Sequence, residues 1–249
     1  MLSIGDGAND VSMINEADVG VGIRGVEGGQ AASASDFSIT EFQQLRPLLM
    51  FHGRECNRRN SYMIQYNFYK NIVFTVPLAL FGLISGWSGE TIYDIYILQI
   101  FNVVFTVWPI IFFCLFDFEH GKEKLMYTPS LYSRALIDPY LSVKTIIGWF
   151  TQALAHGVIV WFLCQVFFGW SLSEDGMTTD MLLQGNMIYL AVVCVCNFQI
   201  LFDSNLFNWI TLLGVIYSIG SYFVCVLIES QFEVFGIYQQ YLDMNTLQI

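Results

Sequence analysis

Five long apolar segments constrain this chain more than any other feature of its sequence. They cover roughly residues 62–87, 92–116, 143–170, 183–202 and 206–228. A helix that crosses the hydrocarbon layer of a membrane needs about 20 apolar residues, and each segment is long enough. Hydrophobic residues make up 55% of the chain and charged residues only 12%, roughly half the usual share of a soluble domain. We therefore expect a mainly α-helical, multi-pass membrane protein, with about five transmembrane helices within residues 52–249.

The lysines and arginines predict how these segments are oriented. All ten lie at or before Lys144, and none lies in the connections at 88–91 and 171–182 or in the tail after residue 229. Eight of them form two groups, one before the first segment and one between the second and third: Arg46, Arg54, Arg58, Arg59, Lys122, Lys124, Arg134 and Lys144. Because basic residues concentrate in cytosolic loops, we expect a cytosolic N-terminal part, a cytosolic 117–142 loop and an exoplasmic tail. The net charge of −11 reflects scarce basic residues, and no nucleic-acid partner is expected.

The first 51 residues have a different, soluble pattern. Short apolar runs predict strands at 2–4, 19–23 and 37–39, alternating with helices at 11–14, 28–34 and 42–51. This alternation is typical of a doubly wound α/β domain. About fifty residues bury too little surface to form such a domain alone. We expect residues 1–51 to be the C-terminal part of a cytosolic α/β domain, and the chain to be part of a longer protein.

The sequence Gly5-Asp6-Gly7-Ala8-Asn9-Asp10 follows the first predicted strand. Two aspartates at the carboxyl end of a strand can share a Mg²⁺ ion, while backbone N–H groups face phosphate oxygens. The glycines let the backbone approach closely. A Gly/Asp/Asn cluster is more often an ordinary turn, so the assignment depends on the residues that follow.

Those residues are more specific. Gly20-Val21-Gly22-Ile23 is followed by Glu27-Gly28, Gln30-Ala31 and Ser35-Asp36-Phe37. Together with the glycine loop, they resemble the C-terminal part of the phosphorylation domain of P-type ATPases, in the form found in the type IV branch, the phospholipid flippases. The resemblance continues through Phe68-Tyr69-Lys70-Asn71 and Asn102-Val103-Val104-Phe105-Thr106 and covers residues 1 to about 230.

The resemblance implies a HAD-like phosphorylation domain and a role for each polar residue of the loop. Asp6 would be a Mg²⁺ ligand, with Asp10 beside the same metal. Asn9 and Asp10 would hold the phosphorylated aspartate and the transferred phosphoryl group. ATP would be the substrate of the intact enzyme. The phosphorylated aspartate of the family lies in a DKTGT motif, which this chain lacks together with a nucleotide-binding domain. We therefore expect the chain alone to be inactive.

Lys70 is the one basic residue in the interior of an apolar segment, since Lys144 lies at the edge of the third segment. It is either a lysine whose ammonium reaches the membrane boundary or a functional charge inside the membrane. The resemblance favours the second reading, in which Lys70 and Asn71 handle the lipid head group.

On the next segment, Asn102, Thr106 and Pro109 are spaced to share one helix face. That face is either ordinary polar packing between helices or, by resemblance, part of the lipid path, with Asn102 and Thr106 as substrate-binding residues.

The sequence thus favours part of an ATP-driven translocase that moves aminophospholipids from the exoplasmic to the cytosolic leaflet. The resemblance implies phosphatidylserine or phosphatidylethanolamine as substrate and a two-span accessory β-subunit as partner. Plasma, Golgi and endosomal membranes are not distinguished. One alternative is a cation-transporting P-type ATPase, although the middle of the first two segments lacks the carboxylates that such pumps need. The other is a truncated, non-catalytic membrane protein.

Overall fold

The computed structural model describes residues 1–25, 29–128, 130–132, 140–168 and 181–231. Glu27, Gly28 and Arg134, the last two residues of the predicted 143–170 segment and the tail after residue 231 lie outside the described residues. The chain divides into two compact units. One consists of Met1–Asn57 with His120–Pro139, and the other of Arg58–Glu119 with Tyr140–Ile249.

The first unit contains a small parallel sheet. Strands β1 (Leu2–Gly5), β2 (Val19–Ile23) and β3 (Phe37–Ile39) pair in that order. Helices α1 (Val11–Glu16) and α2 (Gln30–Ala34) connect them. The core is formed by Ile14, Val21 and Ala31, all nearly inaccessible to solvent. The predicted alternation of strands and helices is therefore confirmed in the described residues.

The last predicted helix of this unit, at 42–51, does not stand alone. A 3₁₀ turn η2 (Phe42–Gln44), a short helix α3 (Leu45–Pro47) and a π-helical stretch η3 (Leu48–Gly53) lead directly into α4 (Arg54–Ile84). Helix α7 (Lys122–Tyr127) packs against η3. Arg46 Nη2, in α3, donates a hydrogen bond of 2.6 Å to the carbonyl of Met126 in α7 and so links these two short helices.

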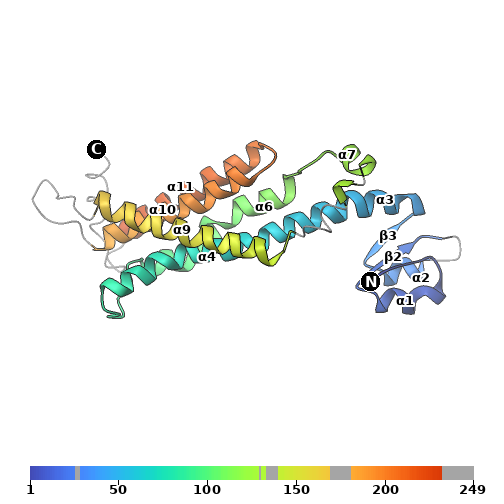
Figure 1. Cartoon of the computed structure of the whole chain (residues 1–249), viewed down its shortest axis with the longest axis horizontal. Coiled ribbons are helices and arrows are strands. Elements are labelled where there is room, and N and C mark those ends of the chain that lie inside the picture. Colours follow the sequence, from blue (N-terminus) through green and yellow to red (C-terminus); the bar gives the residue numbers. More distant parts are fainter. Residues whose placement is uncertain (26–28, 129, 133–139, 169–180, 232–249) are drawn as a thin grey trace, which may run out of the picture. The chain divides into compact units, whose positions relative to one another are not determined.

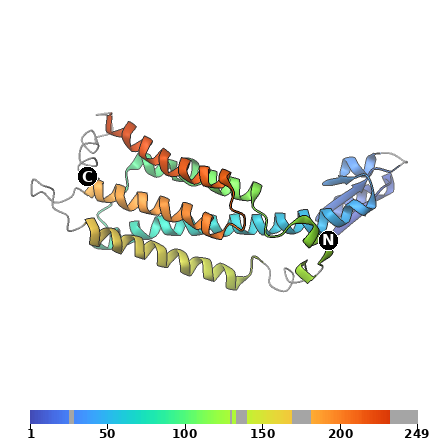
Figure 2. The same ribbon diagram turned by 90° about the horizontal axis from the view of Figure 1, so that it is seen from above.

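The second unit is a bundle of membrane-length helices (Figures 1 and 2). It consists of α4, the composite helix α5 (Ile95–Ile100), η4 (Phe101–Phe105) and α6 (Val107–Phe116), then α9 (Val143–Phe168), α10 (Met181–Asp203) and α11 (Trp209–Gln231). Five helical stretches of the described chain are long and apolar enough to cross a membrane, which confirms the five predicted spans. Helix α10 lies between α9 and α11 in Figure 2 and packs against both.

The bundle core is rich in tyrosine. Tyr66, Tyr93, Tyr189 and Tyr222 are buried, and each donates its hydroxyl to a backbone carbonyl. The bond from Tyr189 to the carbonyl of Ile97 joins α10 to α5 over 2.8 Å. Inside a membrane, polar side chains can join helices where the hydrophobic effect gives no driving force between them. Each ring thus fills the core while its hydroxyl fixes a neighbouring segment.

A second set of polar contacts joins α4, α9 and α10. Gln152 donates to Gln199, and both Gln199 and Tyr62 donate to the carboxylate of Asp203. One turn along α9 from Gln152, His156 Nδ1 lies 2.5 Å from the hydroxyl of Tyr69. These contacts fix the lateral position of α9 against the other two helices.

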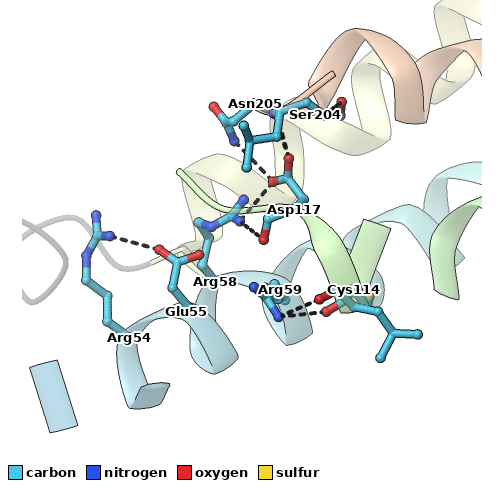
Figure 3. A network of polar contacts seen from close by, with 10 residues as sticks. Arg54, Glu55, Arg58, Arg59, Cys114, Asp117, Ser204 and Asn205 are labelled. Atoms are coloured by element: carbon cyan, nitrogen blue, oxygen red, sulfur yellow. Dashed lines mark hydrogen bonds and ion pairs between the residues drawn. The ribbon is translucent and has the colours of Figure 1, made fainter. Parts of the chain in front are cut away.

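Figure 3 shows the polar network at the end of the bundle where α4 begins and α6 ends. The buried carboxylate of Asp117 accepts from Arg58 Nη2 at 2.8 Å and from the backbone N–H groups of Asn205 and Leu206. Arg59 donates to the carbonyl of Cys114 in the last turn of α6, where a cation is favoured by the helix dipole. Together these contacts tie α4, the end of α6 and the α10–α11 connection.

One close backbone approach sets the position of α10 at the other end of the bundle. A Cβ atom at Gly185 would lie 1.8 Å from the carbonyl oxygen of Ile92, in the segment before α5. Only glycine fits there, because the obstacle is backbone and not the end of a flexible side chain.

We therefore expect Gly185→Ala to destabilise the bundle by about 3 kcal/mol or more, at the upper end of the cost of overpacking. The matched control is Gly220→Ala in α11, where an added Cβ meets nothing within 4 Å. That change should be neutral or stabilise by up to ~1 kcal/mol through helix propensity. Thermal unfolding of both variants in detergent micelles measures the difference, and equal stability of the two would refute the close approach.

Candidate functional site

The glycine loop lies at the carboxyl end of β1, as predicted. It runs from Gly5 through the 3₁₀ turn η1 (Ala8–Asp10) into α1. A Cβ at Gly5 would lie 2.4 Å from the Cβ of Asp10, so glycine is needed for the loop to fold back on itself. Asp6 and Asn9 are exposed, and Asp10 is half-buried. The three polar side chains named from the sequence therefore share one loop.

Asp10 organises this loop. Its Oδ2 atom accepts hydrogen bonds from the backbone N–H groups of Asp6 at 3.1 Å and Gly7 at 3.3 Å. We expected backbone N–H groups of the loop to face phosphate oxygens, but in the structure these two donate to Asp10. The carboxylate of Asp10 thus occupies the position that an external anion would take at these two amides.

The loop residues fit a Mg²⁺ site that is completed by other ligands. Asp6 offers an exposed carboxylate, and Asp10 uses only one oxygen for the loop amides. Such oxygens are what Mg²⁺ prefers, and this ion is commonly bound by one or two carboxylates with phosphate and water. Within the described parts of the chain, no group of three or more His, Cys, Asp or Glu side chains could hold a metal. The oxygen ligands of this loop therefore agree with a Mg²⁺ site in which phosphate, water or other residues supply the remaining ligands. They do not agree with a site in which this loop alone supplies every ligand.

The second candidate site is in the bundle, around Lys70 of α4. The side chain of Lys70 is only 5% exposed, so its ammonium does not extend to the surface of the described bundle. Nζ donates to Thr106 Oγ1 at 3.2 Å and lies 5.9 Å from the ring centre of Tyr66. Among the described residues, no carboxylate forms an ion pair with it. The ammonium is thus enclosed by the described bundle, whereas the side chain of a lysine that reaches the membrane boundary is expected to be exposed at its end.

Thr106 lies at a break in the second span. The π-helical stretch η4 ends at Phe105, and Thr106 has non-helical dihedral angles, φ −131° and ψ −8°. Its hydroxyl donates to the carbonyl of Phe101 at 3.1 Å while accepting from Lys70. Pro109, in the first turn of α6, cannot donate a backbone hydrogen bond, which is consistent with a break at this point.

The prediction that Asn102, Thr106 and Pro109 share one face is wrong. Thr106 and Pro109 are buried, whereas Asn102 is exposed. The reason is the π-helical stretch between Phe101 and Phe105, because its wider turn moves the residues that follow relative to the α-helical spacing. Asn71 is likewise exposed, and so lies on a different side of α4 from the buried Lys70.

Sequence reasoning missed Asn197 of α10. This residue is completely buried, and its Nδ2 donates to the carbonyl of Phe105 at 3.0 Å, directly before Thr106. A carboxamide within the apolar 183–202 segment was the available signal, because polar groups inside a membrane are costly unless they have a partner. Its partner could be found only from the fold.

Comparison with known proteins now bears on both sites. The sequence profile of the C-terminal region of phospholipid-translocating P-type ATPases matches residues 32–248. The chain belongs to this family. Its five membrane-length helices and this match show an integral, multi-pass membrane protein.

Individual relatives agree with this assignment. The chain is 39% identical over 230 residues to the probable phospholipid-transporting ATPase 5 of Arabidopsis thaliana, an alignment that covers 92% of this chain and 19% of the relative. It is also 39% identical over 231 residues to the phospholipid-transporting ATPase tat-1 of Caenorhabditis elegans, covering 92% of this chain and 20% of the relative. The chain therefore spans about a fifth of the length of these curated relatives.

Proposed function

We propose that this chain is the C-terminal part of a longer ATP-driven translocase that moves aminophospholipids from the exoplasmic to the cytosolic leaflet. The family membership supports this proposal, since the relatives are named as phospholipid-transporting ATPases. Residues 1–51 contribute part of the phosphorylation domain, and residues 52–249 contribute five of the spans. The longer protein would form the aspartyl-phosphate, with its acceptor aspartate and nucleotide-binding domain outside this chain.

The buried ammonium of Lys70 is the observation that carries the proposal. Thr106 is its one hydrogen-bond partner in the described bundle, and a neutral hydroxyl does not compensate the charge. A buried cation is costly unless an anion or several polar groups face it. A lipid phosphate or a serine carboxylate supplies such an anion, with charge-assisted hydrogen bonds to the ammonium. Phosphatidylserine and phosphatidylethanolamine are the proposed substrates.

The same observation disfavours a cation pump. A desolvated cation needs several anionic or carbonyl oxygens around it, and a permanent ammonium at that place would repel it. In the spans that the structure describes, carboxylates lie near helix ends, at Glu55, Asp94, Asp117, Asp203 and Glu229. The second alternative is a truncated membrane protein without a substrate. A change of lipid dependence in the variants below would exclude this alternative.

In the cytosolic part, Asp6 and Asp10 are the proposed Mg²⁺ ligands, and Asn9 and Asp10 are proposed to hold the phosphorylated aspartate and the phosphoryl group. When bound, Mg²⁺ would neutralise charge on the transferred phosphoryl group. The chain's own contribution is to fix the positions of these side chains, which the hydrogen bonds from the Asp6 and Gly7 amides to Asp10 accomplish. A two-span accessory β-subunit is the proposed partner.

The first test concerns the loop. In the longer protein, Asp6→Asn should raise the Mg²⁺ concentration needed for half-maximal phosphorylation by at least about tenfold, because a metal ligand loses its charge. Asp10→Asn keeps an oxygen for the loop amides but should lower phosphoenzyme turnover by about 100-fold, as removal of a transition-state contact does. The readouts are phosphoenzyme formation and decay with labelled ATP.

The control for the loop is Glu16→Ala, which removes an exposed carboxylate at the end of α1. It should behave as the wild type. Wild-type Mg²⁺ dependence and turnover in both loop variants would show that Asp6 and Asp10 have no part in the reaction.

The second test concerns orientation. Because all basic residues lie at or before Lys144, the turn at Gly89 should be exoplasmic and the connection at Gly121 cytosolic. A cassette with a glycosylation acceptor, inserted at either place, reports the side directly. Modification at Gly89 and none at Gly121 is expected, and the opposite pattern would reverse the orientation.

The third test concerns Lys70. In the longer protein, Lys70→Ala should raise the phosphatidylserine concentration for half-maximal ATPase activity by about tenfold or more, since a hydrogen bond to a charged group contributes about 1.5–3 kcal/mol. Phosphorylation by ATP should change little. Lys144→Ala is the control, because Lys144 is exposed at the start of α9. A wild-type lipid dependence in Lys70→Ala would exclude the head-group role.

A further inference from the structure

A residue from another helix forms a hydrogen bond to the backbone at the break before α6. Pro109 lacks the N–H group that would bond the carbonyl of Phe105, four residues earlier, in a continuous α-helix. Asn197 of α10 supplies a donor in its place, with its Nδ2 atom 3.0 Å from that carbonyl oxygen. Both Asn197 and Phe105 are completely buried. In a membrane interior no water is present to satisfy the carbonyl, so this bond prevents a large cost.

The carboxamide of Asn197 is held in one orientation. Its second hydrogen bond goes to the carbonyl of Val193, one turn earlier on α10, at 2.9 Å. Both hydrogens of the amide are therefore used, while Oδ1 is buried without a hydrogen-bond partner. Because an unpaired buried acceptor is unfavourable, Asn197 stabilises the fold through its Nδ2 group, which donates both hydrogen bonds, and not through Oδ1.

The bond also determines where Thr106 lies. Thr106 directly follows Phe105, and its hydroxyl both accepts from Lys70 and donates to the carbonyl of Phe101. If the Phe105 carbonyl had no partner, the chain at the break would rearrange to find a donor, and the hydroxyl would move with it. The carbonyl of Cys196, the residue before Asn197, accepts a hydrogen bond from Tyr66, whose ring centre lies 5.9 Å from Lys70 Nζ. Helix α10 thus contacts two residues next to the Lys70 site, Phe105 and Tyr66.

We propose that Asn197 is a positioning residue for the phospholipid head group. It acts through Phe105 and Thr106: by satisfying the carbonyl left free at Pro109, it fixes the break in the second span and directs the Thr106 hydroxyl toward the Lys70 ammonium. The inference rests on the proposed function, in which Lys70 meets the head group. Asn197 itself does not need to touch the lipid.

The test uses Asn197→Leu in the longer protein, reconstituted with increasing mole fractions of phosphatidylserine. The half-maximal phosphatidylserine fraction for ATPase activity should rise about tenfold, comparable to the loss of one hydrogen bond to a charged group. Phosphorylation by ATP in the absence of lipid should stay within twofold of the wild type. Gln199→Leu is the matched control. It removes a buried amide of the same helix that contacts Gln152 and Asp203 and not the break, so it should leave the half-maximal fraction unchanged.

A second variant keeps the proposal testable if Asn197→Leu does not fold. In the double variant Pro109→Ala, Asn197→Leu, residue 109 regains an N–H group that can bond the Phe105 carbonyl within the helix. Asn197→Leu should lower the thermal unfolding temperature in a protein that keeps Pro109 and in one that carries Pro109→Ala. The decrease in the Pro109→Ala protein should be at most half of the decrease in the protein that keeps Pro109. Absence of any such rescue would overturn the proposed role of the bond.

The outcomes separate this inference from the proposed function. If Lys70→Ala alters the phosphatidylserine dependence and Asn197→Leu does not, the positioning role is wrong while the function stands. If neither variant alters the phosphatidylserine dependence, the proposed head-group role of Lys70 is wrong, and the positioning role of Asn197 that rests on it is wrong as well. If Asn197→Leu and Gln199→Leu alter it equally, the effect is general loss of packing in α10, and the positioning role is again wrong.

Discussion

The burial of the Lys70 ammonium, with Thr106 as its hydrogen-bond partner, is the main energetic constraint on the bundle. It places an ammonium group among apolar helices with a neutral partner at 3.2 Å and, in the described residues, no ion pair. Burial of a charge is expensive, so the surrounding helices must supply polar groups or leave a path for a polar ligand. The break at Thr106 supplies one such group, the Thr106 hydroxyl, which accepts a hydrogen bond from Lys70. The ring of Tyr66 adds a weak cation–π contact.

Many of the other polar groups in the described bundle form hydrogen bonds with one another, and these bonds give the Lys70 site a defined frame. Tyrosine hydroxyls donate to backbone carbonyls, and Asn197 donates to the carbonyl at the break. At the end where α4 begins, the Arg58–Asp117 ion pair ties this helix to the end of α6, so both helices that carry the site are fixed at their ends. Hydrogen-bonded frames of this kind can hold a break in a helix in place without changing the apolar surface toward the lipid.

The sequence predicted the five spans and the parallel strands, because segment length and the alternation of apolar residues report directly on these features. It placed Lys70 and Thr106 in the right spans but wrongly put Asn102 on the same face as Thr106, because a π-helical turn leaves no clear mark in the spacing of side chains. The contact of Asn197 with Phe105 joins residues 92 positions apart. Such pairings follow from tertiary packing alone, as does the use of the Asp6 and Gly7 amides by Asp10. The roles of Asp6, Asn9 and Asp10 remain predictions.

The most direct measurement is the structure of the longer protein with phosphatidylserine bound inside the membrane. We predict a head-group oxygen within about 2.7–3.2 Å of Lys70 Nζ, the range of an N–H···O hydrogen bond. Thr106 should remain at the break, and Asn197 should still bond the Phe105 carbonyl. A head group that binds elsewhere in the membrane region, while Lys70 keeps Thr106 as its sole partner, would contradict the central claim.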